Sequence, residues 1–464
     1  MKFCNSLVFS ILGSFLCSAQ EPPIVGAWQV GNQSFEYLGS ASSRDASKIE
    51  ATVEPIEFLA GGTVSDDGDS GTWLFSDDYL LVAAPGRLET FAVSVTGDSF
   101  VYARDERVEV QGGFFIKEVD FNIGVKSPSA PFVASEVEGD WVIFQRKVKS
   151  EDLTIVGITS KSLSEVSQSR INVTLAAEDL FTIQIVTDTS APEDEGISGF
   201  GSWIMDAGAL ETTFLGEVSV RSHFSSGGDL LVVTEDEVDS SGGAIEEFSS
   251  QIEVWIKKPA ILTMGDVVGR WGIAGTTIDV STGSGNQTLD EVGFEESVLE
   301  FRADGTGTIR VVDSGDPGSP GRVNSFVWEL DGVEMVLSNT EGSFQFVISA
   351  EKDFALMQKF EVDLVNESES FDFFAMAKLP NVPGFAETAS GIGLVEDVNG
   401  GRKAVLTTPT MTGLRYQVEM GETLTGWQGS GPIMEGTGGV ITSDLPALSG
   451  GGFFRWRILP PEDE

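Results

Sequence analysis

The residues best suited to nucleophilic chemistry lie in the segment Gly68-Asp69-Ser70-Gly71. A serine in such a setting can be catalytic, but its hydroxyl needs a base, usually an imidazole, to accept the proton. The chain has one histidine, His223, far downstream of Ser70, and no lysine lies near Ser70 in sequence. Segments rich in glycine and aspartate are also typical of turns. We therefore interpret Ser70 as a turn residue and not as a nucleophile.

Acidic loops offer the only evident metal ligands in the sequence. Asp66, Asp67 and Asp69 lie close together, and short turns rich in carboxylates suit Ca²⁺. Their spacing does not match an EF-hand loop, so a solvated acidic surface is favoured over an ion site. One histidine cannot form the multi-histidine sites that zinc and copper prefer. The sequence therefore predicts no cofactor and no metal, with these aspartates as the remaining Ca²⁺ candidates.

Paired carboxylates are the other route to catalysis, because glycoside hydrolases need only two of them. The chain has 72 acidic residues, so candidate pairs are common and spacing selects none. Aromatic residues could instead line a ligand cavity. The candidates that do not follow the repeat described below are Trp255 and the cluster Phe371, Phe373 and Phe374.

Composition restricts the class of protein. The formal net charge of −44 excludes nucleic acid as a partner, since no basic stripe can displace counterions. With 41% hydrophobic residues the chain is still expected to fold. Residues 1–19 have the basic start, short apolar run and small-residue end of a secretory signal peptide. Both cysteines, Cys4 and Cys17, lie within it, and no later stretch is apolar enough to span a membrane.

A Gly-x-Trp signature recurs three times, at intervals of one small domain. It is followed each time by a second tryptophan and by a strand-like segment ending in Lys-x-Pro. Phe58 and Phe301 stand at the same distance after the first and third signatures, and Leu175 takes that place in the middle copy. The signature residues are Gly26 and Trp28 with Trp73, Gly139 and Trp141 with Trp203, and Gly269 and Trp271 with Trp328.

The local pattern within each copy is that of β-strands. Residues 91–95 alternate between larger apolar and smaller side chains, and Asp304-Gly305 and Asp331-Gly332 are typical hairpin turns. No apolar period of helical type is sustained. We predict a meander of about eight antiparallel strands in each copy.

With the segment Phe301 to Thr306, this pattern resembles the lipocalin-like β-barrel domains of secreted bacterial proteins. The resemblance implies that the first tryptophan plugs one end of each barrel and that any ligand enters at the other. The predicted fold is all-β: three tandem antiparallel meander β-barrels followed by a small β-sandwich. The expected domains are the signal peptide (1–19), the repeats (20–128, 129–259 and 260–381) and the C-terminal sandwich (385–464).

These observations favour an exported, non-catalytic binding or surface-interaction protein. Its expected partner is a small apolar ligand or a cell-surface or extracellular molecule, and its location is the periplasm, the cell surface or the medium. The alternative is a secreted hydrolase that uses a pair of carboxylates in one barrel. The sequence selects neither a ligand nor an oligomeric state.

Export is directly testable. After expression of the full chain in a bacterial host, we expect the exported protein to begin at Gln20, because the small residues ending at Ala19 form the cleavage site. Intact mass measurement of the exported fraction checks this. An exported protein that retains Met1 to Ala19 would contradict the assignment.

Overall fold

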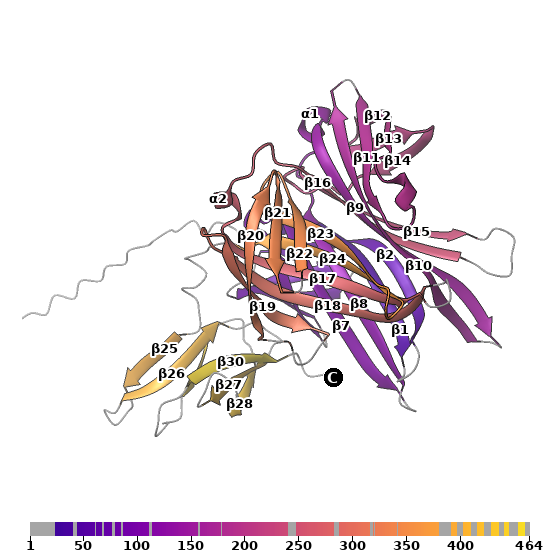
Figure 1. Ribbon diagram of the computed structural model, residues 1–464. Helices are drawn as coiled ribbons and strands as arrows, with labels where there is room; N and C mark the ends of the chain where they lie inside the picture. Colours follow the sequence, from indigo (N-terminus) through magenta and orange to yellow (C-terminus); the bar gives the residue numbers. More distant parts are fainter. Residues whose placement is uncertain are drawn as a thin grey trace, which may run out of the picture.

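The computed structural model is an all-β protein (Figure 1). It describes residues 24–379 except 40–43, 61, 67–68, 77–78, 85–86, 111–113, 156–157, 178, 240–246, 283–286, 316–318, 320 and 341. It also describes residues 391–396, 402–409, 415–421, 428–435, 440–444 and 453–459. Residues 1–19, the predicted signal peptide, lie outside the described residues. Within the described ranges no helix is long and apolar enough to cross a membrane.

The first repeat forms an eight-stranded antiparallel barrel. Each strand pairs with the next along the chain, and β1 pairs with both β2 and β8, which closes the ring. Phe91 and Val93 point into the barrel while Ala92 points out, as the period of two requires. The strands are β1 (Gly26–Gly39), β2 (Arg44–Leu59), β3 (Thr63–Asp66), β4 (Asp69–Ser76), β5 (Tyr79–Ala84), β6 (Arg87–Val93), β7 (Ser99–Val110) and β8 (Phe114–Lys126).

The second repeat forms a barrel that is closed less completely. The short β14 pairs with β13, and the chain then meets β15 through an isolated bridge between Phe224 and Leu231. A pairing of Ala46 with Lys161 joins the first two barrels into one sixteen-stranded sheet. The elements are α1 (Ala134–Val137), β9 (Gly139–Ile155), β10 (Ile158–Ala176), β11 (Leu180–Asp188), the 3₁₀ turn η1 (Pro192–Asp194), β12 (Ser198–Asp206), β13 (Ala209–Phe214), β14 (Glu217–Arg221), β15 (Leu230–Asp239) and β16 (Glu247–Lys257).

The third repeat forms a closed barrel of eight strands. The prediction of an all-β chain with three eight-stranded antiparallel barrels is therefore confirmed. The elements are α2 (Met264–Val267), β17 (Gly269–Ser281), β18 (Thr288–Phe301), β19 (Thr306–Ser314), β20 (Val323–Asp331), β21 (Glu334–Asn339), β22 (Gly342–Ile348), β23 (Phe354–Asp363) and β24 (Ser368–Lys378).

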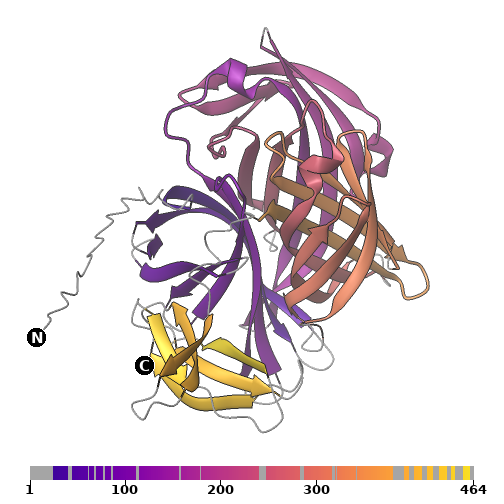
Figure 2. The same cartoon turned by 90° about the vertical axis from the view of Figure 1, so that its left-hand side faces the viewer.

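The C-terminal segment contributes two three-stranded sheets, in the strand orders β25-β26-β29 and β28-β27-β30. Its strands are those at the yellow end of the colour scale in Figure 2. Val418 in β27 is buried. Two sheets are the elements that a sandwich needs, and the packing of one upon the other stays a prediction. The strands are β25 (Gly391–Glu396), β26 (Arg402–Pro409), β27 (Arg415–Gly421), β28 (Gln428–Glu435), β29 (Val440–Asp444) and β30 (Phe453–Leu459).

The repeat signature closes the same end of each barrel. The indole Nε1 of Trp271 donates to the carbonyl of Val267, 2.8 Å away, in the short helix α2. Gly269 has φ +131°, a backbone conformation that side chains rarely adopt, which explains the glycine. Trp328 donates to Thr306 at the hairpin between β18 and β19. All six tryptophans of the signature are at most 7% exposed: Trp28, Trp73, Trp141, Trp203, Trp271 and Trp328.

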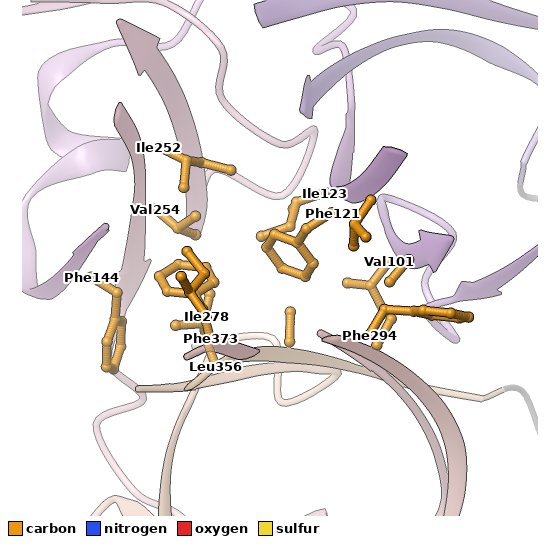
Figure 3. Packing of buried hydrophobic residues seen from close by; sticks show 14 of the residues in the cluster. Val101, Phe121, Ile123, Phe144, Ile252, Val254, Ile278, Phe294, Leu356 and Phe373 are labelled. Atoms are coloured by element: carbon orange, nitrogen blue, oxygen red, sulfur yellow. The ribbon is translucent and has the colours of Figure 1, made fainter. Parts of the chain in front are cut away.

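The three barrels share a fourth apolar core, which lies between them. Each barrel has its own interior cluster, but the largest cluster is built from side chains that point outward from all three. Figure 3 shows this packing, with Phe121 from the first barrel, Phe144 from the second and Phe373 from the third. Burial of these faces stabilises the contact by about 25 cal/mol for each Å² removed from water. The barrels therefore form one packed body.

Arg146 lies at the centre of this junction and is fully buried. Its Nε donates to Gln33 Oε1 of the first barrel at 2.7 Å, and its Nη1 donates to Thr276 Oγ1 of the third at 2.8 Å. The guanidinium also faces the rings of Phe35 and Phe373, with centroids at 5.5 and 5.0 Å. Gln33, Arg146 and Thr276 follow Trp28, Trp141 and Trp271 by the same number of residues. Equivalent positions of the three repeats therefore meet, as pseudo-threefold symmetry requires.

Three aspartates form a second such meeting point. Asp98, Asp229 and Asp353 precede the seventh strand of their barrels and are at most 6% exposed. Thr96 of the first barrel donates to Asp353 of the third, and the amide of Glu351 donates to Asp229 of the second at 3.1 Å. Each aspartate also accepts a hydrogen bond from the serine that starts its own hairpin, which is Ser94, Ser225 or Ser349.

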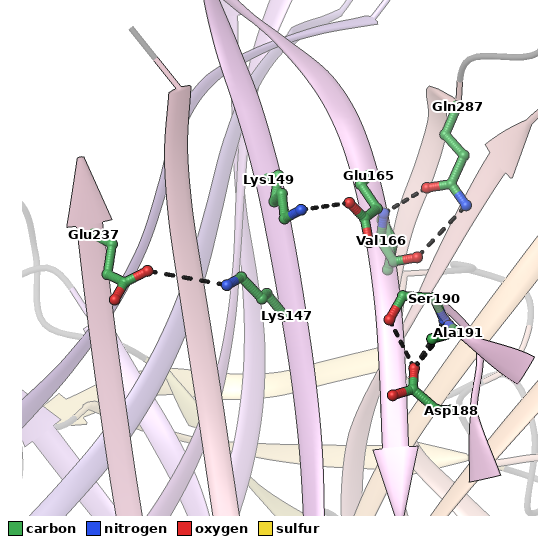
Figure 4. Close-up of polar contacts among 9 residues, drawn as sticks. All are labelled: Lys147, Lys149, Glu165, Val166, Asp188, Ser190, Ala191, Glu237 and Gln287. Atoms are coloured by element: carbon green, nitrogen blue, oxygen red, sulfur yellow. Dashed lines mark hydrogen bonds and ion pairs between the residues drawn. The ribbon is translucent and has the colours of Figure 1, made fainter. Parts of the chain in front are cut away.

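Polar contacts tie the barrels together at the edge of the junction as well. The side-chain amide of Gln287, just before β18, contacts both backbone groups of Val166 in β10 (Figure 4). Gln168 in β10 donates to the carbonyl of Asp372 in β24 at 2.9 Å. The wall of the third barrel is therefore held by the second.

The aspartate cluster makes stability depend on pH. Burial, with the charges of Asp98 and Asp353, raises the pKa of Asp229 to about 7 from the ordinary value of 3.8. Folding therefore favours the protonated carboxyl, so stability falls as pH rises between these two values. We expect Asp229→Asn to stabilise the protein by about 2–4 kcal/mol at about pH 8 and to have little effect at about pH 4.

Urea unfolding of Asp229→Asn and the parent protein at both pH values measures this difference. Asp206→Asn, at an exposed turn of the same barrel, is the matched control and should change little at either pH. Equal effects of Asp229→Asn at both pH values would show that the carboxylate charge does not matter.

Candidate functional site

The third barrel contains a cavity of 380 Å³ at the end away from Trp271. This volume lies within the range of pockets that hold small ligands. Its deeper wall is formed by apolar side chains from seven strands, β18 to β24. They are Leu299, Ile309, Phe326, Leu337, Phe344, Phe346, Met357 and Phe374.

The mouth of the cavity is acidic. Asp279 and Asp372 project from neighbouring strands β17 and β24, and Glu295 and Glu361 lie on β18 and β23. Lys359 is the one cation among the lining residues described. It pairs with Glu361 at 2.6 Å and lies 4.4 Å from the centroid of the Phe344 ring. The lysine is thus engaged by its own neighbours.

A second hollow of 440 Å³ continues this acidic mouth outward. It shares Asp279, Glu361 and Ser370 with the cavity, so the two are contiguous. The residues that line it include no lysine or arginine in the described part of the chain. They are Asp279, Asp290, Glu291, Glu361, Asp363, Ser368, Glu369 and Ser370.

The two carboxyls deepest in the mouth hold protons more strongly than usual. Burial raises the pKa of Asp372, although a hydrogen bond from Thr277 Oγ1 at 2.6 Å and the nearby Lys359 oppose the rise. Burial also raises the pKa of Asp279, and the charges of Glu291 and Asp290 add to it. The mouth therefore has an excess of negative charge that its own residues do not neutralise.

The first barrel fills the equivalent space with aromatic rings. The first and third barrels can be aligned strand by strand, because Trp28 pairs with Lys126 in the first as Trp271 pairs with Lys378 in the third. Phe100 of the first barrel then corresponds to Ala355 of the third, and Tyr102 to Met357. In the first barrel, Phe91 stacks on Tyr102 with centroids 4.1 Å apart and on Phe100 at 4.9 Å. Their cross-strand partners change the other way, since Gly124 and Asn122 correspond to Met376 and Phe374. The third barrel thus distributes its side chains differently between these two strands, and its cavity lies beside Met357 and Phe374.

Polar residues at the mouth also differ between the first and third barrels. Arg104 and Asp120 of the first barrel correspond to Lys359 and Asp372 of the third. Arg104 donates to Asp120 at 2.6 Å and to Glu89 at 2.8 Å, so these charges are matched inside the barrel. Burial alone would lower the pKa of Arg104, but the two carboxylates raise it. In the third barrel the shorter lysine pairs with Glu361 instead, which leaves Asp372 facing the cavity.

The second barrel fills this space with an ion pair. Arg221 Nε donates to Glu253 Oε1 at 2.8 Å, and its guanidinium lies 5.0 Å from the ring of Trp255. These residues correspond to Phe346, Phe374 and Met376 of the third barrel. Trp255 donates its indole hydrogen to Glu253, and Arg221 also donates to Thr212 at 3.0 Å. The partners are mutually satisfied in the interior.

The residues considered for nucleophilic chemistry are placed apart. Ser70 is an exposed residue of β4 in the first barrel and pairs with Ser65, so it lies in a strand and not in the turn itself. His223 lies in the second barrel, where its carbonyl accepts from the amide of Val232 at 3.1 Å. Burial lowers the pKa of the His223 imidazole. The structure gives Ser70 a position in a sheet without bringing this histidine to it.

The other predicted candidates have mixed outcomes. The side chains of Asp66, Asp67 and Asp69 lie outside the described residues. Among the described residues, no group of three or more histidine, cysteine, aspartate or glutamate side chains is arranged to hold a metal ion. Of the irregular aromatic residues, Phe374 lines the cavity, whereas Phe371 and Phe373 face the junction and Trp255 packs inside the second barrel.

Comparisons with known proteins give little guidance. No family model and no curated protein matches the sequence. Among solved structures, a protein of unknown function of the DUF3598 family from Nostoc punctiforme PCC 73102 is 10% identical, over 53% of this chain and 97% of that chain, with a TM-score of 0.19. A transferrin binding protein B double mutant from Haemophilus parasuis Hp5 is 8% identical, over 76% and 95%, with a TM-score of 0.22. At these TM-scores neither match carries an argument about this chain.

The ion pair of the second barrel is open to a direct test. Arg221→Met leaves Glu253 buried without its cation, so we expect a loss of about 3–5 kcal/mol of stability at neutral pH. Adding Glu253→Gln removes the stranded charge and keeps an acceptor for Trp255, so most of the loss should be recovered. Urea unfolding of the single and double variants measures both values. Additive losses would show that the two charges do not act as a pair.

Proposed function

We propose that the protein is an exported, non-catalytic binding protein whose third barrel holds a small ligand with an apolar body. This proposal rests on a difference between the three barrels in the side chains at equivalent interior positions. The first and second barrels place aromatic rings or an ion pair where the third has a cavity of 380 Å³ with an apolar wall. An eight-stranded barrel is large enough for one small ligand when its side chains leave room.

Because their interiors differ, the three barrels have different roles in this proposal. The first and second barrels bury their outer faces in the shared junction and so support the third. The hydrogen bond from Gln168 to the carbonyl of Asp372 connects the second barrel directly to the cavity wall. We propose that the third barrel binds the ligand and that the other two keep its wall rigid.

A hydrolase is the second candidate, because the third barrel brings carboxylates together. Thr277 pairs with Asp372 and Asp279 with Ser370, so Asp279 and Asp372 are diagonal neighbours across two strands. The backbone positions of such neighbours lie about 7–8 Å apart, so two carboxyl groups on them can reach one bound substrate, as paired catalytic carboxylates do. The apolar wall offers a sugar few hydrogen-bonding partners, so binding remains the better reading of this site.

Binding of a neutral fluorescent probe tests the proposal. N-phenyl-1-naphthylamine brightens in apolar surroundings, and we expect saturable binding of one probe per chain. Met357→Tyr places in the third barrel the residue that fills the first, and should weaken binding by about tenfold or more while the fold is kept. Titration by fluorescence measures the affinity.

Val327→Tyr is the matched control, because it adds the same ring at an exposed position of the third barrel. It should leave probe affinity unchanged. Equal affinity of the parent protein and Met357→Tyr, or no saturable binding by the parent, would refute the assignment of the cavity. Hydrolysis of chromogenic glycosides that is lost in Asp372→Asn would favour the hydrolase instead.

A further inference from the structure

We infer that the ligand of the third barrel is a cationic amphiphile, a small molecule with one apolar chain or ring system and an amine or quaternary ammonium head. This inference rests on the proposed function and adds the chemical class of the ligand. The cavity combines an apolar wall with a negatively charged mouth.

The apolar part of the ligand is dictated by the deeper wall. Leu299, Phe326 and Met357 present apolar surface to the cavity, and this surface is closed below by the layer that contains Trp328. An apolar chain that displaces water from such a wall gains about 0.8 kcal/mol for each buried methylene group. A fully polar ligand would gain nothing there.

The head group is dictated by the mouth. Asp279 and Asp372 lie where the apolar wall ends, and Glu295 lies beside them on β18, the strand that pairs with the other edge of β17. Glu295 accepts a hydrogen bond from Ser297 at 2.7 Å, and Asp372 accepts one from Thr277, so both carboxylates are oriented by hydroxyl groups. Oriented carboxylates at the edge of an apolar cavity match a cationic head better than a neutral or anionic one.

The one lysine of the cavity does not supply the missing cation. Lys359 is held by Glu361 and by the face of the Phe344 ring. Its counterpart in the first barrel, Arg104, instead satisfies two carboxylates at once. The third barrel thus has the carboxylate of that pair, Asp372, but has a lysine where the first barrel has the arginine whose guanidinium binds it. A ligand amine can bind Asp372 in place of that guanidinium.

The acidic hollow beyond the mouth extends the attraction. Asp290, Glu291, Asp363 and Glu369 line it together with carboxylates of the mouth. Their summed field concentrates cations near the entrance and repels anions. The raised pKa of Asp279, to which Asp290 and Glu291 contribute after burial, is the response that such an uncompensated cluster should show.

Three decyl compounds with different heads test the inference by displacement of N-phenyl-1-naphthylamine at concentrations below micelle formation. We expect decyltrimethylammonium to bind about tenfold or more tightly than 1-decanol, and decanoate to bind more weakly than 1-decanol. The preference for the cation should shrink as pH falls, because protonation removes the charges of Asp279 and Asp372, and also as salt concentration rises.

Substitutions then locate the effect. Asp279→Asn with Asp372→Asn should reduce the affinity for decyltrimethylammonium about tenfold or more and leave that for 1-decanol nearly unchanged. Glu329→Gln with Asp331→Asn removes the same charge from exposed positions of β20 and should change neither affinity. If the mouth double variant does not fold, each single variant and the pH series on the parent protein give the same comparison.

The outcomes separate this inference from the proposed function. If the neutral probe and 1-decanol bind but the cation gains nothing over them, the inference is wrong and the apolar cavity still binds ligands. If the control double variant weakens cation binding as much as the mouth variant, the general field of the protein is responsible and the inference is likewise wrong. If neither the probe nor any decyl compound binds, the proposed function itself fails.

Discussion

The structure depends on burial of the outer faces of three barrels against one another. A lone barrel of this kind would expose Phe121, Phe144 or Phe373 to water, whereas the assembled chain hides them in one core. Arg146 lies at the centre of this core. Its guanidinium donates hydrogen bonds to Gln33 and Thr276 and lies over aromatic rings. Because a buried guanidinium is costly without such partners, this contact favours one relative arrangement of the barrels.

Triplication makes that arrangement possible and also explains how it can carry function. Equivalent residues meet around a pseudo-threefold axis, where Asp98, Asp229 and Asp353 come within reach of one another's hairpins. Once three copies share a junction, their interiors can diverge independently, since outward and inward side chains alternate along each strand. The interior of one copy became aromatic, another holds an ion pair, and the third has a cavity.

The cavity links stability and binding through the same elements. Strand β24 contributes Phe373 to the junction and Asp372 and Phe374 to the cavity. Any change that loosens the junction would therefore alter the mouth. Burial lowers the pKa of Arg146 at the junction, and the negative charge of Asp372 opposes this effect. A ligand charge near Asp372 would therefore also act on Arg146. Wall and junction are two faces of one strand.

Sequence alone determined the class of fold and the order of its parts, because signature tryptophans, hairpin turns and the strand period are local features. Phe58, Leu175 and Phe301, which the sequence places at corresponding positions of the copies, pair with Gly26, Gly139 and Gly269. The sequence also contained the substitution of Phe100 and Tyr102 by Ala355 and Met357, which a residue-by-residue alignment of the copies could have revealed. Only the tertiary structure decided which interior is hollow, which carboxylates share its mouth and how the barrels meet. These depend on side chains from strands far apart in the chain, whose contacts no local pattern encodes.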